Sequence, residues 1–167
     1  METAEIPEQH QKKQPGVEAE MEPRPDSTLE GYRGSGKLQD KVAIITGGDS
    51  GIGRAAAVAF AKEGADIAIA YLEEHGDASD TKKEIEQCGR KCLLIAGDVG
   101  NEQFCSEVAA KTMAAFGHID ILVNNAAEQH VRESIMDIDN AQLEKTFRTN
   151  IFSMFHMVKA VLPHLKK

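Results

Sequence analysis

The sequence predicts an α/β fold built as a doubly wound parallel sheet, and two observations support this. From residue 41 onward, short apolar runs alternate with segments of helical periodicity, and glycine-containing turns separate them. The runs are apolar throughout, which is typical of strands that helices cover on both faces of a sheet. Because crossovers between parallel strands are right-handed, the expected spatial strand order is 3-2-1-4, with flanking helices.

Four apolar runs are predicted as strands: 42–46, 66–71, 91–96 and 119–124. The first connecting helix is predicted over 52–63, where Gly64 ends it in a left-handed conformation. The capping box Thr81-Lys82-Lys83-Glu84 predicts that the next helix opens there and ends at Gly89.

Two further helices are expected in the second half of the chain. Asn101 is a predicted N-cap, and Gly117 ends the helix that follows it. From about Asp139 a long amphipathic helix is predicted, because apolar residues recur with a 3.6-residue period at Leu143, Phe147, Ile151, Met154, Val158 and Leu162.

Residues 1–40 differ from the rest of the chain and are predicted to form an extended arm rich in proline and glutamate. Four of the five prolines lie here, and apolar periodicity is absent. Tyr32 and the Gly34-Ser35-Gly36 joint suggest that the last part of the arm docks. For the first 20 residues, a solvated tail is the alternative.

Composition excludes several classes of protein. The chain has 167 residues and a formal charge of −8, which fits one domain and argues against a nucleic-acid partner. No apolar run approaches the roughly 20 residues that span a bilayer, and no secretory signal opens the chain, so we expect a cytoplasmic protein. The cysteines and histidines show no metal-ligand spacing, and we expect reduced, mostly buried thiols.

A glycine-rich turn, Thr46–Gly53, lies between the first strand and an Ala-rich helix. Such a turn presents backbone N–H groups and a helix N-terminus to an anion such as a pyrophosphate. A P-loop is excluded because Arg54-Ala55 stand where lysine and a hydroxyl residue are required. A turn that merely connects two elements is the alternative.

The remaining polar motifs fall at the carboxyl ends of the other predicted strands. Tyr71 ends the second strand, Asp98 follows the third, and Asn124-Asn125 end the fourth. Ligands of a doubly wound sheet bind at these ends, at the switch point between strands 1 and 4. The pattern therefore predicts a Rossmann-type ligand site.

These motifs resemble the short-chain dehydrogenase/reductase family. The resemblance rests on Thr46–Gly53, Asp98-Val99, Asn124–Ala127 and Asn150, and it covers residues 38–167. A bacterial subgroup related to glucose dehydrogenases and general stress proteins is more similar still, since it carries an arm ending like Tyr32–Leu38.

The resemblance implies a role for each position. Around the turn, the residues that face the pyrophosphate and the adenosine ribose are Gly47, Asp49, Ser50, Gly51, Ile52 and Gly53. Asp98 would accept the adenine amine while Val99 packs on the ring; a turn or N-cap acid is the alternative for Asp98. Small Asn125, Ala126 and Ala127 would let the cofactor pass the fourth strand, although the family usually has glycine at Ala127. Asn150 resembles the catalytic asparagine, on a locally distorted helix.

Cofactor choice is expected to depend on the residues after the second strand. An acid there binds the ribose 2′-OH of NAD, whereas an arginine accommodates the 2′-phosphate of NADP. Here Tyr71 and Leu72 are followed by Glu73-Glu74, and the only nearby base is Arg54. The cofactor is therefore NAD or NADP, with NAD favoured and use of both allowed.

The family's remaining catalytic groups have no counterpart in the sequence. A tyrosine with a lysine four residues later and a serine on a further strand are required, but Gly36 and His75 follow Tyr32 and Tyr71 at that spacing. We expect a chain that stops before this trio: an NAD(P)-dependent oxidoreductase acting on a small alcohol or carbonyl, inactive as it stands. The alternative is a non-catalytic nucleotide-binding stub that docks on full-length relatives. The resemblance also implies a homo-oligomer, a tetramer.

Overall fold

A computed structural model describes residues 16–23, 25, 27 and 29–165. The first 15 residues of the predicted arm lie outside the described residues. The sheet has four parallel strands, β1 (Val42–Thr46), β2 (Asp66–Tyr71), β3 (Cys92–Ala96) and β4 (Ile121–Val123). Their order is β3-β2-β1-β4, which confirms the predicted fold class and topology.

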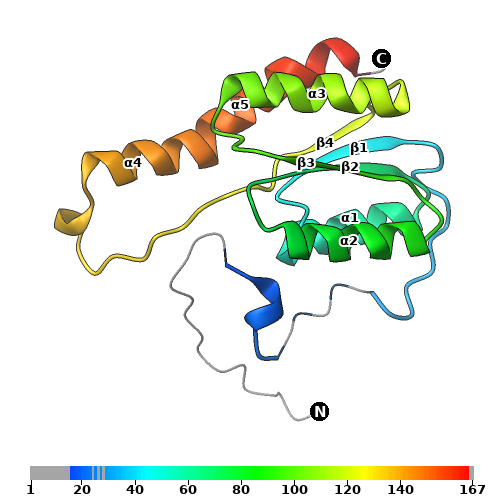
Figure 1. Cartoon of the computed structure of the whole chain (residues 1–167), viewed down its shortest axis with the longest axis horizontal. Helices are drawn as coiled ribbons and strands as arrows, with labels where there is room; N and C mark the ends of the chain where they lie inside the picture. The colour runs from blue at the N-terminus through cyan, green and yellow to red at the C-terminus, as the bar shows by residue number, and fades with distance from the viewer. Residues whose placement is uncertain (1–15, 24, 26, 28, 166–167) are drawn as a thin grey trace.

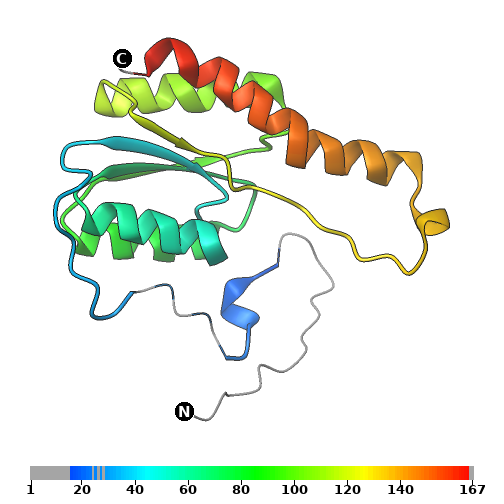
Figure 2. The same cartoon turned by 180° about the vertical axis from the view of Figure 1, so that it is seen from behind.

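Helices cover both faces of this sheet (Figures 1 and 2). On one face lie α1 (Gly51–Lys62) and α2 (His75–Gln87), and on the other lie α3 (Glu102–Phe116) and α5 (Ser153–Val161). As predicted, Asn101 caps α3 by accepting from the N–H of Gln103, and Gly117 ends it. No helix among the described residues is long and apolar enough to cross a membrane.

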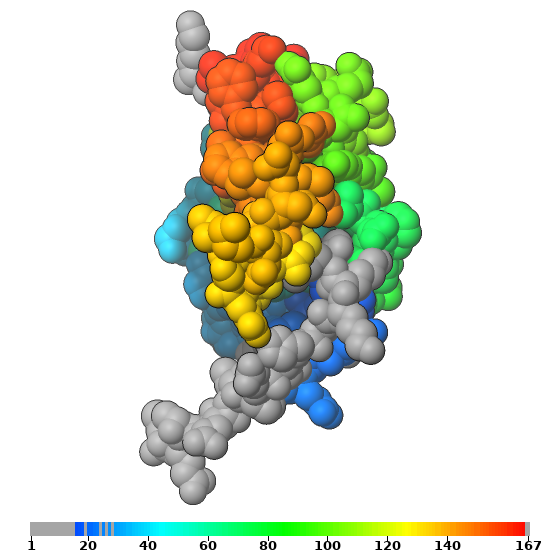
Figure 3. Space-filling view, turned by 90° about the vertical axis from the view of Figure 1, so that its left-hand side faces the viewer, coloured from blue at the N-terminus to red at the C-terminus, as the bar shows by residue number. Residues whose placement is uncertain are grey.

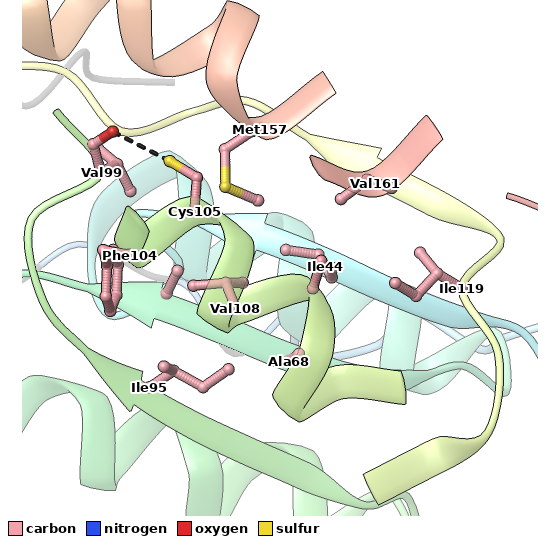
Figure 4. Packing of buried hydrophobic residues seen from close by; sticks show 12 residues of the cluster. Ile44, Ala68, Ile95, Val99, Phe104, Cys105, Val108, Ile119, Met157 and Val161 are labelled. Carbon is pink, nitrogen blue, oxygen red and sulfur yellow. Dashed lines mark hydrogen bonds between the residues drawn. The ribbon is translucent and has the colours of Figure 1, made fainter. Parts of the chain in front are cut away.

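Each face of the sheet has its own hydrophobic core. The cluster beneath α3 and α5 is drawn in Figure 4 and includes Ile44, Phe104, Cys105, Val108 and Met157. There the Cys105 thiol donates to the carbonyl of Val99 at 3.1 Å, and burial raises its pKa to about 11. All three cysteines are free, which agrees with the expectation of reduced thiols.

The predicted start of the second helix was wrong. α2 begins at His75, six residues before the supposed cap, and Thr81 is fully buried within it. The Thr81 hydroxyl does not accept from a backbone N–H; it donates to the carbonyls of Asp49 and Asp77 at 2.8 and 3.1 Å. Thr81 therefore ties α2 to the glycine-rich turn.

Strand β4 is shorter than predicted, and side chains bond to backbone groups at both of its ends. Before it, the Asp120 carboxylate accepts from the N–H of Val42 at 2.9 Å, in place of a backbone carbonyl. After it, the Thr46 hydroxyl accepts from the N–H groups of Asn125 and Ala126. Only an isolated parallel bridge, between Ile119 and Leu165, lies outside the named strands in the described part of the chain.

The long helix predicted from about Asp139 is confirmed as one continuous helical stretch from Asn140 to Val161, with a π-helical turn inside it. The 3-10 turn η2 (Ile135–Asp137) precedes α4 (Asn140–Phe147), and the π-helical turn η3 (Arg148–Phe152) joins α4 to α5. A 3-10 turn, η4 (Leu162–His164), follows α5. Figure 1 shows that α4 projects past the carboxyl ends of the strands, away from the sheet.

Part of the N-terminal segment packs along α1. The carboxylate of Glu63, which follows α1, accepts from the backbone N–H groups of Ser35 and Lys37, both at 2.9 Å. The Tyr32 hydroxyl donates to the same carboxylate. These bonds lower the pKa of Glu63 to about 2, with the Tyr32 bond the largest cause.

Acid should therefore release the Tyr32–Lys37 segment. Because the folded pKa of Glu63 lies below the ordinary value of 4.5, its contribution is complete above about pH 4.5 and is lost as the pH falls toward about 2. The chain has no tryptophan and only two tyrosines, so in a Tyr71→Phe background Tyr32 fluorescence reports this contact. We expect a transition in that pH window that Glu63→Gln lacks. A Tyr32 signal that stays flat down to pH 2 would contradict the assignment.

Candidate dinucleotide-binding site

A hollow lies at the carboxyl end of the sheet, between β1 and β4. Most of the residues predicted to hold a cofactor line it: Gly47, Asp49, Ser50, Tyr71, Leu72, Asp98, Val99, Asn125, Ala126 and Ala127. Glu128 lines it as well, and so do four residues that were not predicted: Ala70, Gly97, Lys145 and Thr149. Lys145 and Thr149 stand four residues apart, on one helical face, which is the signal that could have found them.

The glycine-rich turn is a tight cradle beside this hollow. Gly47 has a φ of +63°, and a Cβ placed on Gly53 would lie 1.9 Å from the carbonyl oxygen of Gly47. The Asn125 side chain donates to the carbonyls of Thr46 and Gly47 at 3.1 and 2.9 Å. Backbone packed this closely, with no side chain between helix and strand, fits the pyrophosphate site of a dinucleotide.

Thr46 organises the crevice between β1 and β4. Its side chain is 2% exposed, and its hydroxyl oxygen accepts from the N–H groups of Asn125 and Ala126, both at 3.0 Å. Sequence reasoning placed Thr46 in the motif without giving it this role. The hydroxyl closes the end of β4 onto the end of β1, so it sets the width of the site.

The end of β2 forms another wall of the hollow, and the start of α2 packs behind it. The Tyr71 hydroxyl is 2.8 Å from Nδ1 of His75, and the two rings meet edge to face. Burial raises the pKa of the Asp49 carboxyl, and the charges of Asp77 and Glu74 add to the shift. This wall is therefore acidic.

Asp98 lines the hollow, and it also stabilises a turn, which was the alternative to adenine binding. Its Oδ1 accepts from the N–H of Gly100 at 2.7 Å, and its carbonyl accepts from the N–H of Asn101. These bonds shape the turn that leads into α3. Val99, which follows it, is 6% exposed and belongs to the core beneath that helix.

Three predicted residues of the turn do not line the hollow. Gly53 lies behind it in the cradle, whereas Ile52 is 84% exposed at the start of α1. The N–H of Gly51 is engaged by the arm, donating to Oε2 of Glu18 at 2.6 Å. Sequence reasoning missed Glu18, because nothing in the proline-rich arm marks it as a contact residue.

Asn150 stands apart from the first hollow. It lies on the π-helical turn η3 and lines a second hollow next to α4, together with Glu128, His130 and Gln142. Its side chain accepts from the N–H of Glu128 and donates to the carbonyl of Glu128, both at 2.8 Å. Asn150 therefore fixes the chain after β4, and the helix is distorted there as the resemblance implied.

Glu128 lines both hollows, and its carboxylate lies close to one basic side chain from each of them. Its carboxylate lies 3.1 Å from Nζ of Lys145 and 3.6 Å from Nε2 of His130. Among the residues that the structure describes, no three His, Cys, Asp or Glu side chains gather as metal ligands would. The polar groups present suit a polar organic ligand.

Comparison with curated proteins gives close relatives. The chain is 65% identical over 159 residues to "Uncharacterized oxidoreductase YhdF" of Bacillus subtilis (strain 168), covering 95% of this chain and 55% of the relative. "General stress protein 39" of the same organism is 59% identical over 162 residues, with 97% and 57% covered. "Glucose and ribitol dehydrogenase" of Daucus carota is 42% identical over 169 residues, with 98% and 58% covered.

Solved structures show the same likeness. A short chain dehydrogenase from Burkholderia cenocepacia J2315, in complex with NADP, matches with a TM-score of 0.74 and 33% identity. The match covers 78% of this chain and 53% of that one. The chain thus spans about half the length of the relatives it matches. A family profile described as short chain dehydrogenase matches residues 41–167, and the chain belongs to the short-chain dehydrogenase family.

Proposed function

We propose that this chain binds NAD or NADP for an oxidoreductase that acts between an alcohol and a carbonyl compound. The observation that carries the proposal is the cradle of Gly47 and Gly53, in which no Cβ fits, beside a hollow at the switch point of the sheet. When bound, the nicotinamide cofactor supplies the hydride chemistry, and the protein supplies binding and orientation.

Each part of the hollow takes a role in this proposal. The backbone around Asp49–Ile52 holds the pyrophosphate and the adenosine ribose. Asp98 and Val99 hold the adenine, and Asn125–Ala127 leave room beside β4 for the rest of the cofactor. We place Asn150 at the substrate side because it fixes Glu128, which borders both hollows.

NAD is the cofactor we favour, with use of NADP allowed. The residues after β2 are Leu72, Glu73 and Glu74, and Asp49 adds a further carboxylate to the same wall. Carboxylates accept from a ribose hydroxyl and repel a 2′-phosphate. The observation that favours NADP is that the Burkholderia cenocepacia relative was solved in complex with NADP.

We further propose an arm over residues 1–40 and a binding domain over 41–167, in a cytoplasmic protein that self-associates. Free cysteines fit a reducing compartment. Association is supported by large apolar side chains exposed along the helical segment from α4 to η4, since exposed apolar patches mark interfaces. They are Leu143, Phe147, Ile151, Phe155, Val158 and Leu162.

The 167-residue chain should bind NADH without turning over substrate. Tyr71 and Tyr32 are the only tyrosines, neither is followed by a lysine four residues later, and their hydroxyls bond to His75 and Glu63. NADH fluorescence should show saturable binding that Ala126→Leu weakens at least about tenfold by filling the hollow. Ala114→Leu, at an exposed position on α3, is the matched control and should bind as the unchanged chain does.

Two results would overturn this. If the 167-residue chain oxidised alcohols, the claim that it is inactive would be wrong. The absence of NADH binding, with self-association seen by sedimentation, would favour the alternative, a non-catalytic module that docks on relatives through α4 and α5.

A further inference from the structure

Glu18, in the 3-10 turn η1 (Glu18–Glu20), bridges the starts of α1 and α2. Its Oε2 accepts from the N–H of Gly51 at 2.6 Å, and its Oε1 accepts from Nη1 of Arg54 at 2.9 Å. Its own N–H donates to Oδ2 of Asp77 at 3.0 Å. The residue is only 3% exposed, so this part of the arm is built into the domain.

The bridge does not line the hollow, but the group that it holds at the start of α1 directly follows a residue that does. Ser50 and Leu72 line the hollow from the two sides, and the groups that Glu18 holds follow them closely in the chain: Gly51 directly and Asp77 in the first turn of α2. In this fold the ribose 2′ position lies near the end of the second strand. Figure 3, which looks onto the carboxyl ends of the strands, shows the blue arm on the same side as the projecting segment 131–147.

We propose that Glu18 selects against a 2′-phosphate and so makes this site prefer NAD to NADP. The inference rests on the proposed function, since it concerns the choice between the two cofactors. Besides the residues after β2, it assigns a selecting group to the N-terminal arm, 33 positions before Gly51 of the glycine-rich turn.

The first reason is that Glu18 satisfies the start of α1. The exposed N–H groups and the dipole of a helix N-terminus attract phosphate. Here the N–H of Gly51, directly after Ser50 of the hollow, already donates to the Glu18 carboxylate, so this one donor is taken, while the pyrophosphate that NAD and NADP share is proposed to use the neighbouring backbone of the turn. At this donor a 2′-phosphate therefore meets a carboxylate instead of an open N–H.

The second reason is that Glu18 holds the nearby cation. The Arg54 side chain is 4% exposed, and its guanidinium also donates to Glu84. An arginine held between two carboxylates is not available to a phosphate. The other cation at the hollow, Lys145, is paired with Glu128.

The acidic surroundings add to both effects. Asp49 lines the hollow, and its pKa is raised by burial and by the charges of Asp77 and Glu74. These carboxylates repel a phosphate, which is doubly charged near neutral pH, but they do not repel a neutral ribose hydroxyl.

The test compares the affinities of the 167-residue chain for NADH and NADPH by isothermal titration. Glu18→Gln keeps the size of the side chain and removes its charge, and its one amide oxygen retains one of the two acceptors that the carboxylate offers to Gly51 and Arg54. We expect this change to raise the affinity for NADPH relative to NADH by about fivefold. Glu20→Gln removes the same charge from an exposed position of the same turn and should leave the ratio unchanged.

The outcomes separate this inference from the proposed function. An unchanged NADPH-to-NADH ratio in Glu18→Gln, or equal losses for both cofactors, would overturn the selecting role and leave the proposed function standing. An unchanged chain that binds neither cofactor would overturn both. A chain lacking residues 1–28 removes Glu18 entirely and should show the same shift in ratio, in case Glu18→Gln does not fold.

Discussion

Replacing Gly53 with alanine is expected to abolish dinucleotide binding and to destabilise the fold. The new Cβ would lie 1.9 Å from the carbonyl oxygen of Gly47 and 2.5 Å from Nδ2 of Asn125. The first of these is backbone and cannot rotate away, so α1 has to move off β1. We expect a loss of about 3 kcal/mol in the free energy of unfolding, at the upper end for overpacking.

Thermal unfolding and NADH titration measure the two effects. A loss of that size lowers Tm by roughly 6–12 °C in a domain of this length. Gly76→Ala is the matched control, because a Cβ at Gly76 meets no atom within 4 Å and its φ is not positive. If Gly53→Ala binds NADH as tightly as Gly76→Ala does, the cradle is not the pyrophosphate site.

The pattern of apolar runs and glycine turns in the sequence was sufficient to predict the strand order and the position of the site. Strands such as Val42–Thr46 are apolar throughout, and the glycine-rich turn leads straight into α1, so both could be recognised from neighbouring residues. The order of strands then follows from the handedness of crossovers. Residues at the strand ends were brought to one hollow as expected, including Tyr71, Asp98 and Asn125.

Errors arose where a side chain bonds to a distant part of the chain. Thr81 looks like a helix cap locally, but its hydroxyl reaches the carbonyl of Asp49, 32 residues away. Glu18 similarly contacts Arg54, 36 residues on, and no periodicity in the arm announces it. Such pairs depend on how elements pack, so a pattern of neighbouring residue types does not contain them.

Arg54 shows how such a pair changes a functional argument. In the sequence it is the base nearest the glycine-rich turn, and so a candidate partner for a phosphate. In the structure it is buried between Glu18 and Glu84, and its charge is paired with these two carboxylates. The preference for NAD that the sequence favoured therefore gains a physical argument that the sequence alone did not hold.

Thr46→Val is the second change with a large expected effect. Valine matches the shape of threonine, but it leaves the N–H groups of Asn125 and Ala126 without their acceptor. Each donor left unsatisfied away from water costs about 1–3 kcal/mol, so we expect a total loss of about 3 kcal/mol. The end of β4 should also separate from β1, which weakens NADH binding together with stability.

Thr112→Val isolates this effect from the loss of a hydroxyl in general. Thr112 is fully buried in α3, and its hydroxyl only donates to the carbonyl of Val108, four residues earlier. That carbonyl already accepts the helical N–H of Thr112, so its replacement strands no donor and should cost less than about 1 kcal/mol. Denaturant unfolding of both variants compares the two threonines directly. Equal losses would mean that buried hydroxyls matter alike in this chain, and that Thr46 has no special part in joining β4 to β1.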